Sequence, residues 1–173
     1  MRGLALAEKN NRSHPDIRFI GVGNEYRQDD GVGIFIARQL GLLHLPGARA
    51  AETPRDTTRL MNLWQGADIV FVFDAVYSGG TAGAVYRLEA VKESLADDLF
   101  QLSTHALGIA QAVELSRVLS QLPAELIIFG IEGKNFGQGQ GLSLPCRRSV
   151  MQVIRLVSEE IRNSTIRPGA YAS

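Results

Sequence analysis

Three residues combine reactive chemistry with a position at the end of a secondary-structure element. Asp74 closes an otherwise apolar run, Asp30 follows the first apolar segment, and His105 opens a helical segment. Carboxylate and imidazole groups suit divalent ions such as nickel, zinc, manganese or iron, and three ligands leave positions open for a substrate or water. We therefore predict that the three side chains share one metal ion, although ligand type alone does not select which ion.

Each of these residues also has a simpler interpretation. An aspartate ahead of a helix often caps it, which applies to Asp29 and Asp30 alike. A histidine at a helix start can form a local hydrogen bond. Asp74 is the strongest candidate, because a charge that ends a buried strand must be paired, solvated in a cleft or ligated. His14 and His44 lie outside the expected helices and strands, and we assign them no role.

Apolar patterning predicts strands that alternate with helices. Short apolar segments predict strands at residues 17–22, 48–52, 68–74, 84–88 and 125–131. Apolar residues at helical spacing predict helices at residues 33–43, from Asp56 or Thr57 to about 66, at 105–122 and in the final segment, where Val150, Val153, Ile154, Val157 and Ile161 form one stripe. This alternation indicates an α/β fold, a three-layer α/β/α sandwich with a mostly parallel twisted sheet of about five strands.

Such a sheet would bring the three candidate residues to one edge. Ligands of open α/β sheets bind outside the carboxyl ends of the strands. Asp30 follows the first strand, Asp74 closes the third, and His105 begins the helix before the last strand. We therefore expect all three at the carboxyl edge.

Length and composition indicate a single domain. The chain has 173 residues, and we expect a flexible arm at residues 1–16, the domain at 17–162 and a tail at 163–173. Lys+Arg and Asp+Glu both total 18, which argues against a broad nucleic-acid footprint. The single cysteine, Cys146, excludes an intrachain disulfide and is expected to be a packed side chain. No segment resembles a secretory signal or a membrane span, so we expect a cytoplasmic protein.

Familiar catalytic and cofactor motifs are missing from the sequence. Gly21 and Gly23 suggest a dinucleotide-binding turn, but the third glycine of that fingerprint is replaced by Tyr26. The two glycines are better explained by a tight turn that lets backbone pass close to the site. No H-E-x-x-H, G-x-S-x-G or P-loop pattern occurs, which argues against a self-contained zincin or serine hydrolase.

Three motifs together resemble the [NiFe]-hydrogenase maturation proteases: Gly21-Val-Gly-Asn-x4-Asp-Asp-Gly-Val-Gly33, Val72-Phe-Asp-Ala75 and Thr104-His-Ala-Leu-Gly108. The resemblance covers roughly residues 17–161. It implies an endopeptidase that removes the carboxy-terminal extension from the precursor of a hydrogenase large subunit after nickel insertion. The family's acidic ligand falls on Asp30, its second carboxylate on Asp74 and its histidine on His105, so these are the implied catalytic and metal-binding residues. Nickel would be supplied by the bound precursor.

Two segments need separate treatment. The family is often glycine-rich after the second strand, where this chain has Ala51-Glu-Thr-Pro-Arg-Asp56, so we transfer no substrate contacts to that segment. The loop Glu132–Gly141 is long, and its composition is typical of a mobile loop. We hypothesise that it helps to grip the precursor, although glycine and asparagine also serve turns generally.

Two other functions stay open from the sequence. A peptidyl-tRNA hydrolase-like protein also begins with a strand, a G-x-G-N turn and a tyrosine, but it needs a histidine where this chain has Gln28-Asp-Asp30, and neutral net charge suits tRNA poorly. A non-enzymatic nickel carrier or assembly factor would use the same three ligands, but should bind free nickel tightly. For the protease we expect the hydrogenase precursor as partner, a monomer, and neither nucleic acid nor membrane.

Overall fold

One five-stranded sheet forms the centre of the protein. The computed structural model describes residues 13–91 and 107–165. The strand order is β2-β1-β3-β5-β4, with β4 antiparallel to β5 and the other neighbours parallel. The strands are β1 (Ile17–Val22), β2 (Ala48–Thr53), β3 (Ile69–Val76), β4 (Val85–Glu89) and β5 (Glu125–Glu132). The predicted α/β class with a mostly parallel sheet of about five strands is confirmed.

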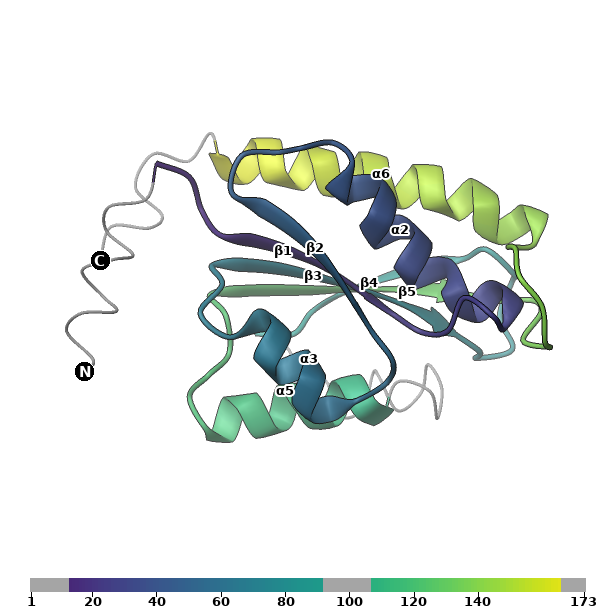
Figure 1. Ribbon diagram of the computed structural model, residues 1–173, viewed down its shortest axis with the longest axis horizontal. Helices are drawn as coiled ribbons and strands as arrows, with labels where there is room; N and C mark the ends of the chain where they lie inside the picture. Colours follow the sequence, from purple (N-terminus) through teal and green to yellow (C-terminus); the bar gives the residue numbers. More distant parts are fainter. Residues whose placement is uncertain (1–12, 92–106, 166–173) are drawn as a thin grey trace.

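Helices cover both faces of this sheet (Figure 1). Two of them, α2 (Val32–Gly41) and α6 (Leu144–Thr165), pack on one face. The other two, α3 (Thr57–Trp64) and α5 (Leu107–Val118), pack on the opposite face. A short 3-10 helix, η1 (Gln28–Gly31), joins β1 to α2. Within the described ranges, no helix has both the length and the apolar character that a membrane crossing requires.

Strand β3 shows how the sequence pattern fixes the core. All eight of its residues are buried, because helices cover both sides of the central strands. Successive side chains point to opposite faces of a strand. Phe71 and Phe73 therefore pack with α2 and α6, whereas Val70 and Val72 pack with α3 and α5. Asp74 continues the second series and faces the α3 and α5 side.

Some elements extend beyond their predicted ends. Strand β3 continues past Asp74, because Ala75 and Val76 are buried and keep their pairing with β5. The carboxylate therefore stands inside the strand and not at its last residue. Helix α6 runs on to Thr165, past the predicted domain end at residue 162. The predicted arm and tail fall mostly outside the described residues.

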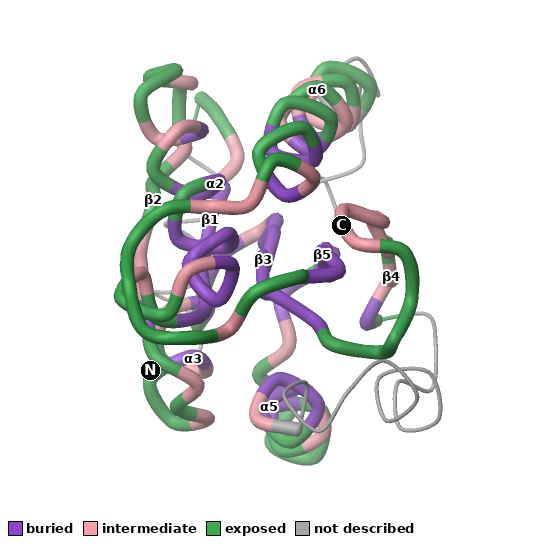
Figure 2. Tube along the Cα trace, turned by 90° about the vertical axis from the view of Figure 1, so that its right-hand side faces the viewer, coloured by how far each residue is buried: buried purple, intermediate pink, exposed green. Residues whose placement is uncertain are grey.

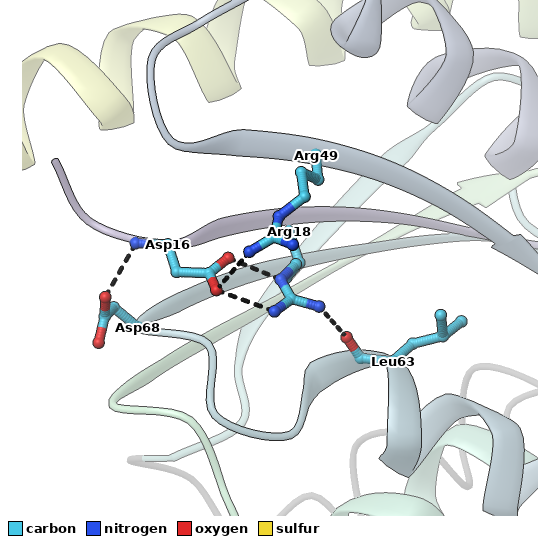
Figure 3. A network of polar contacts seen from close by, with 5 residues as sticks. All are labelled: Asp16, Arg18, Arg49, Leu63 and Asp68. Atoms are coloured by element: carbon cyan, nitrogen blue, oxygen red, sulfur yellow. Dashed lines mark hydrogen bonds and ion pairs between the residues drawn. The ribbon is translucent and has the colours of Figure 1, made fainter. Parts of the chain in front are cut away.

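A charge network closes the amino-terminal edge of the sheet (Figure 3). The buried carboxylate of Asp16 accepts hydrogen bonds from Arg18, at 2.6 and 2.8 Å, and from Arg49, at 3.0 Å. The backbone N–H of Asp16 donates to the carboxylate of Asp68 at 2.8 Å. These contacts attach the last residue of the predicted arm to the domain. At this edge the buried acid has two arginine partners.

Candidate active site

The strand order changes direction between β1 and β3, and such a switch point is where open α/β sheets bind ligands. From β1 the chain passes outward to β2 on one side, whereas β3 and β5 lie on the other. Asp30 comes from η1, directly after β1, and Asp74 comes from β3. Figure 2 shows the molecule from the side toward which the arrows of β3 and β5 point in Figure 1, with both strands buried at the centre.

Two glycines allow η1 and the start of α2 to lie directly on the sheet. Gly23 has φ +138°, and a Cβ there would collide with the carbonyl oxygen of Asp30. A Cβ on Gly33 would collide with the carbonyl oxygen of Phe73, the neighbour of Asp74. The glycine pattern therefore serves close backbone approach, as its sequence interpretation predicts, and brings Asp30 next to β3.

Arg55 joins the two candidate carboxylates. Its Nη2 atom lies 2.7 Å from Oδ1 of Asp30 and 2.8 Å from Oδ1 of Asp74. The carboxylate side chains are 1% and 2% exposed, whereas the Arg55 side chain is 21% exposed. The structure thus brings Asp30 and Asp74 within reach of one nitrogen atom. Their catalytic and metal-binding roles stay predictions.

Sequence reasoning missed Arg55. Its segment follows β2 and precedes α3, so it lies at the same carboxyl edge as the two acids. The available signal was a basic residue in the segment where the chain departs from the family pattern. Asp56, its neighbour, caps α3 by accepting a hydrogen bond from the backbone N–H of Arg59 at 2.7 Å.

Each carboxylate uses only part of its hydrogen-bonding capacity. Among residues 13–91 and 107–165, Oδ2 of Asp30, Oδ2 of Asp74 and Nε of Arg55 are buried without a hydrogen-bond partner. Buried polar atoms normally have a partner, so such groups point to a function. With both acids ionised, one guanidinium faces two carboxylates and leaves a net negative charge. The group therefore has the capacity to take up a further cation or a proton.

The electrostatics of this group favour proton exchange at Asp74. Burial raises the pKa of Asp74 to about 7 against the opposing effect of Arg55, and the charge of Asp30 raises it further. Burial works against the charge of Arg55, but Asp74 and Asp30 together raise the Arg55 pKa above its ordinary value. Near neutral pH, Arg55 stays charged while Asp74 can gain or lose a proton, which suits acid–base catalysis.

His105, the third predicted ligand, lies outside the described residues. The described start of α5 lies beside the segment that carries Arg55: Thr57 Oγ1 donates to the carbonyl of Gly108 at 3.3 Å, and a Cβ on Gly108 would be 3.5 Å from the carbonyl oxygen of Arg55. Within the described part of the chain, no three His, Cys, Asp or Glu side chains form a group that could hold a metal ion. The three-ligand site therefore stays a prediction.

Residues 55–160 match the HycI family of hydrogenase maturation proteases. The chain belongs to this family. Hydrogenase expression/formation protein HupD of Thiocapsa roseopersicina is 26% identical over 123 residues, and the match covers 70% of this chain but only 56% of HupD. Hydrogenase expression/formation protein HoxM of Azotobacter vinelandii is 25% identical over 150 residues, which are 84% of this chain and 72% of HoxM.

Solved structures of hydrogenase maturation proteases share the fold. The hydrogenase maturating endopeptidase HybD from E. coli superposes with a TM-score of 0.74 at 21% identity, covering 86% of this chain and 93% of HybD. The [NiFe] hydrogenase maturation protease HybD from Thermococcus kodakarensis gives a TM-score of 0.70 at 24% identity, covering 84% and 98%. The predicted family resemblance is confirmed, and the match favours it over a peptidyl-tRNA hydrolase-like protein.

Asp29, the neighbour of Asp30, binds backbone N–H groups and has no hydrogen bond to Arg55 among the described contacts. Its carboxylate accepts hydrogen bonds from the backbone N–H groups of Lys134 and Asn135, both at 2.9 Å, and of Ser143, at 2.7 Å. Burial opposes its ionisation, but these hydrogen bonds lower the pKa of Asp29 below its ordinary value. Of the two adjacent acids, Asp30 contacts Arg55, whereas Asp29 attaches η1 to the loop between β5 and α6.

The loop predicted from its composition to be mobile is attached to η1 at several points. Gln28 N–H donates to the carbonyl of Gly139 at 2.9 Å, and Gly139 N–H donates to the carbonyl of Tyr26 at 2.9 Å. Together with the Asp29 contacts, these bonds fix the loop beside the site.

A further buried carboxylate, Glu132, ends strand β5. It accepts hydrogen bonds from the backbone N–H groups of Ser78, Gly79 and Gly80 at 2.9–3.2 Å, and from the Ser78 hydroxyl at 2.7 Å. Glu132 therefore anchors the glycine-rich turn after β3. The sequence marks Glu132 in the same way as Asp74, because each is a charged residue at the end of an apolar run.

Cys146 is a packed residue, as predicted. It is fully buried in the core between the sheet and α6, and its thiol donates to the carbonyl of Glu132 at 3.5 Å. Burial raises the pKa of Cys146 to about 11. The thiol is therefore protonated at neutral pH and is a poor nucleophile.

Proposed function

We propose that the chain is an endopeptidase that removes the carboxy-terminal extension from the precursor of a [NiFe]-hydrogenase large subunit after nickel insertion. The observation that carries this proposal is the buried pair Asp30 and Asp74, joined by one guanidinium at the switch point of the sheet. These are the positions onto which the family resemblance transfers two ligands. The precursor is then the partner, and the enzyme works as a cytoplasmic monomer.

In this proposal nickel belongs to the substrate. Asp30 and Asp74 would each offer an oxygen to the nickel of a docked precursor, and His105 would offer a nitrogen. The unpartnered Oδ2 atoms mean that contacts within the described residues do not saturate either carboxylate. Oxygen and nitrogen ligands leave other positions of the ion to the cysteine thiolates of the hydrogenase. Recognition of nickel would thus place the scissile peptide in register with the site.

The chemistry would be attack of water on the scissile peptide carbonyl. Asp74 would be the proton acceptor, because burial raises its pKa to about 7. It would take a proton from the attacking water and return one to the amine nitrogen of the departing extension. The nickel carried by the precursor would polarise the carbonyl or orient the water. Asp30 would hold the ion, and the fixed loop beside η1 would border the substrate.

A groove of about 470 Å³ beside η1 suits an extended segment of the precursor. It lies between α2, the loop before α6 and the first turn of α6, and its lining residues are Glu25, Gln28, Gly31, Ile34, Phe35, Arg38, Gln140, Gly141, Leu142 and Arg147. Phe35 is 45% exposed there. We propose that the precursor binds in this groove, where the loop hypothesised to grip it forms one wall. Ile34, Phe35 and Leu142 would supply the apolar contacts.

The proposal is tested by incubating the purified chain with a nickel-loaded large-subunit precursor and measuring precursor mass. The wild-type chain should shorten the precursor at a single bond, whereas Asp74→Asn should leave it intact. The proposal would be contradicted if the wild-type chain has the circular dichroism spectrum of a folded protein and still does not shorten the loaded precursor.

A further inference from the structure

Arg55 contacts the same two carboxylates that would hold a metal ion in the proposed site. One nitrogen, Nη2, is within 2.8 Å of an oxygen from each acid. An ion that took these two oxygens as ligands would replace the nitrogen in its contacts with them. The guanidinium and such an ion therefore compete for the same oxygen atoms.

Arginine cannot become a ligand in that position. Its guanidinium has only donors and stays protonated in proteins, and the two acids raise its pKa further. A bound cation would face a fixed positive charge at close range in a buried place where water screens little. Simultaneous occupation is therefore unfavourable on steric and on electrostatic grounds.

The contacts of Arg55 with the two acids stabilise the site when no metal is present. Two buried carboxylates that both approach one point would repel each other, and the guanidinium between them removes that repulsion. The Arg55 side chain is also the most exposed of the three, at 21% against 1% and 2%. It projects from the short segment between β2 and α3, so it has a route to solvent that the acids lack.

We propose that Arg55 is a displaceable internal cation that keeps free divalent metal out of the Asp30–Asp74 site. This inference rests on the proposed function, which it deepens. Arg55 fills the site in the isolated enzyme, and it leaves when a docked precursor presents a metal already held by other ligands. Discrimination between loaded and unloaded precursor then depends on an ion that only the complex can hold.

The test is calorimetric titration of the isolated chain with Ni²⁺ alone, without any precursor. Wild-type protein should bind weakly. Arg55→Gln removes the charge and keeps a hydrogen-bonding side chain, so it should bind Ni²⁺ at least about 10-fold more tightly, and adding Asp74→Asn should abolish that gain. Arg55→Lys, which keeps the charge, should stay close to wild type.

The matched control is Arg38→Gln. Arg38 also bridges two acids, Glu25 and Glu52, at 2.6–3.1 Å, but on the surface with a side chain that is 44% exposed. This variant should bind Ni²⁺ like wild type. An equal gain in the two glutamine variants would contradict a specific role for Arg55.

Two results would overturn the inference. One is a folded Arg55→Gln protein with no gain in Ni²⁺ affinity. The other is tight binding of Ni²⁺ by the wild-type protein that is lost in Asp74→Asn. This second comparison does not use Arg55→Gln, so it tests the inference even if that variant does not fold. Cleavage of the loaded precursor by the wild-type protein separates the two proposals. If wild type cleaves but Arg55→Gln gains no Ni²⁺ affinity, only the Arg55 inference is wrong. If Arg55→Gln gains Ni²⁺ affinity but wild type does not cleave, only the proposed protease function is wrong.

Discussion

Arg55 and Asp74 form a partly buried ion pair, with 2.8 Å between Nη2 and Oδ1, although they come from opposite sides of the switch point of the sheet. The segment after β2 supplies the arginine, and the central strand β3 supplies the acid. Because the same nitrogen also contacts Asp30, the positive charge of Arg55 lies between the two carboxylates. The expected behaviour of the enzyme follows from that arrangement.

Asp74→Asn should reduce cleavage of the loaded precursor at least about 100-fold, because general acid–base groups contribute on the order of 10²–10⁴. The near-isosteric amide should leave the circular dichroism spectrum native. Rates are measured by mass spectrometry of the precursor. Asp56→Ala is the matched control: it removes the cap of α3, costs about 1 kcal/mol of stability and should cleave at nearly the wild-type rate. Equal losses in both variants would argue for a structural effect.

His105→Ala should also abolish cleavage while the protein stays folded, since the family resemblance makes His105 the third ligand. The measurement is the same precursor assay beside circular dichroism. Retention of more than about half of the wild-type rate would remove His105 from the site and leave only two ligands.

Asp29→Ala should mainly reduce stability. The change leaves three backbone N–H groups without their acceptor, and hydrogen bonds to a charged group are worth about 1.5–3 kcal/mol each, so we expect a loss of at least about 2 kcal/mol in urea unfolding. Cleavage at low temperature should fall less than in Asp30→Ala. Equal loss of activity in both folded variants would reopen the choice between these two acids.

Stability should depend on pH through Asp74. Its pKa rises from an ordinary 3.8 to about 7 on folding, so between these values the folded state binds a proton that the unfolded state has lost. The stabilisation is full below about pH 4 and is lost as the pH rises through about 7. Wild type should therefore lose more stability than Asp74→Asn between pH 5 and pH 8 in urea denaturation. Parallel pH profiles would show that Asp74 titrates as in the unfolded chain.

Phe35→Ser should raise the KM for precursor several-fold without changing kcat, because it removes apolar surface from the groove and no contact with Asp30 or Asp74. Val118→Ser is the control, since Val118 is 79% exposed on α5, away from the groove. A change in KM of the same size in both variants would exclude a specific docking role.

The centre of the sheet was predictable from the sequence, because strands β1, β3 and β5 are buried on both faces and form nearly continuous apolar runs. The edge shared by Asp30 and Asp74 followed from the parallel topology. The position of Asp74 inside β3 was not predicted, because it depends on continued pairing of Ala75 and Val76 with β5, which the local pattern does not encode. The choice of Asp30 over Asp29 came from the family resemblance alone. Its physical basis is the set of backbone donors to Asp29, which lie more than 100 residues later in the chain.

Arg55 escaped for a different reason. A basic residue in a surface segment normally predicts a solvated side chain. Only the close approach of η1 to β3, which Gly23 and Gly33 permit, places two acids where that side chain can reach both. The contact is a property of the tertiary packing.

The most direct measurement compares two precursors of the same hydrogenase large subunit, one loaded with nickel and one free of it, under identical incubation with the purified chain. If Asp30, Asp74 and His105 recognise nickel in the substrate, only the loaded precursor should be shortened, as read by intact-protein mass spectrometry. Shortening of both precursors, or of neither, would contradict a nickel-sensing protease.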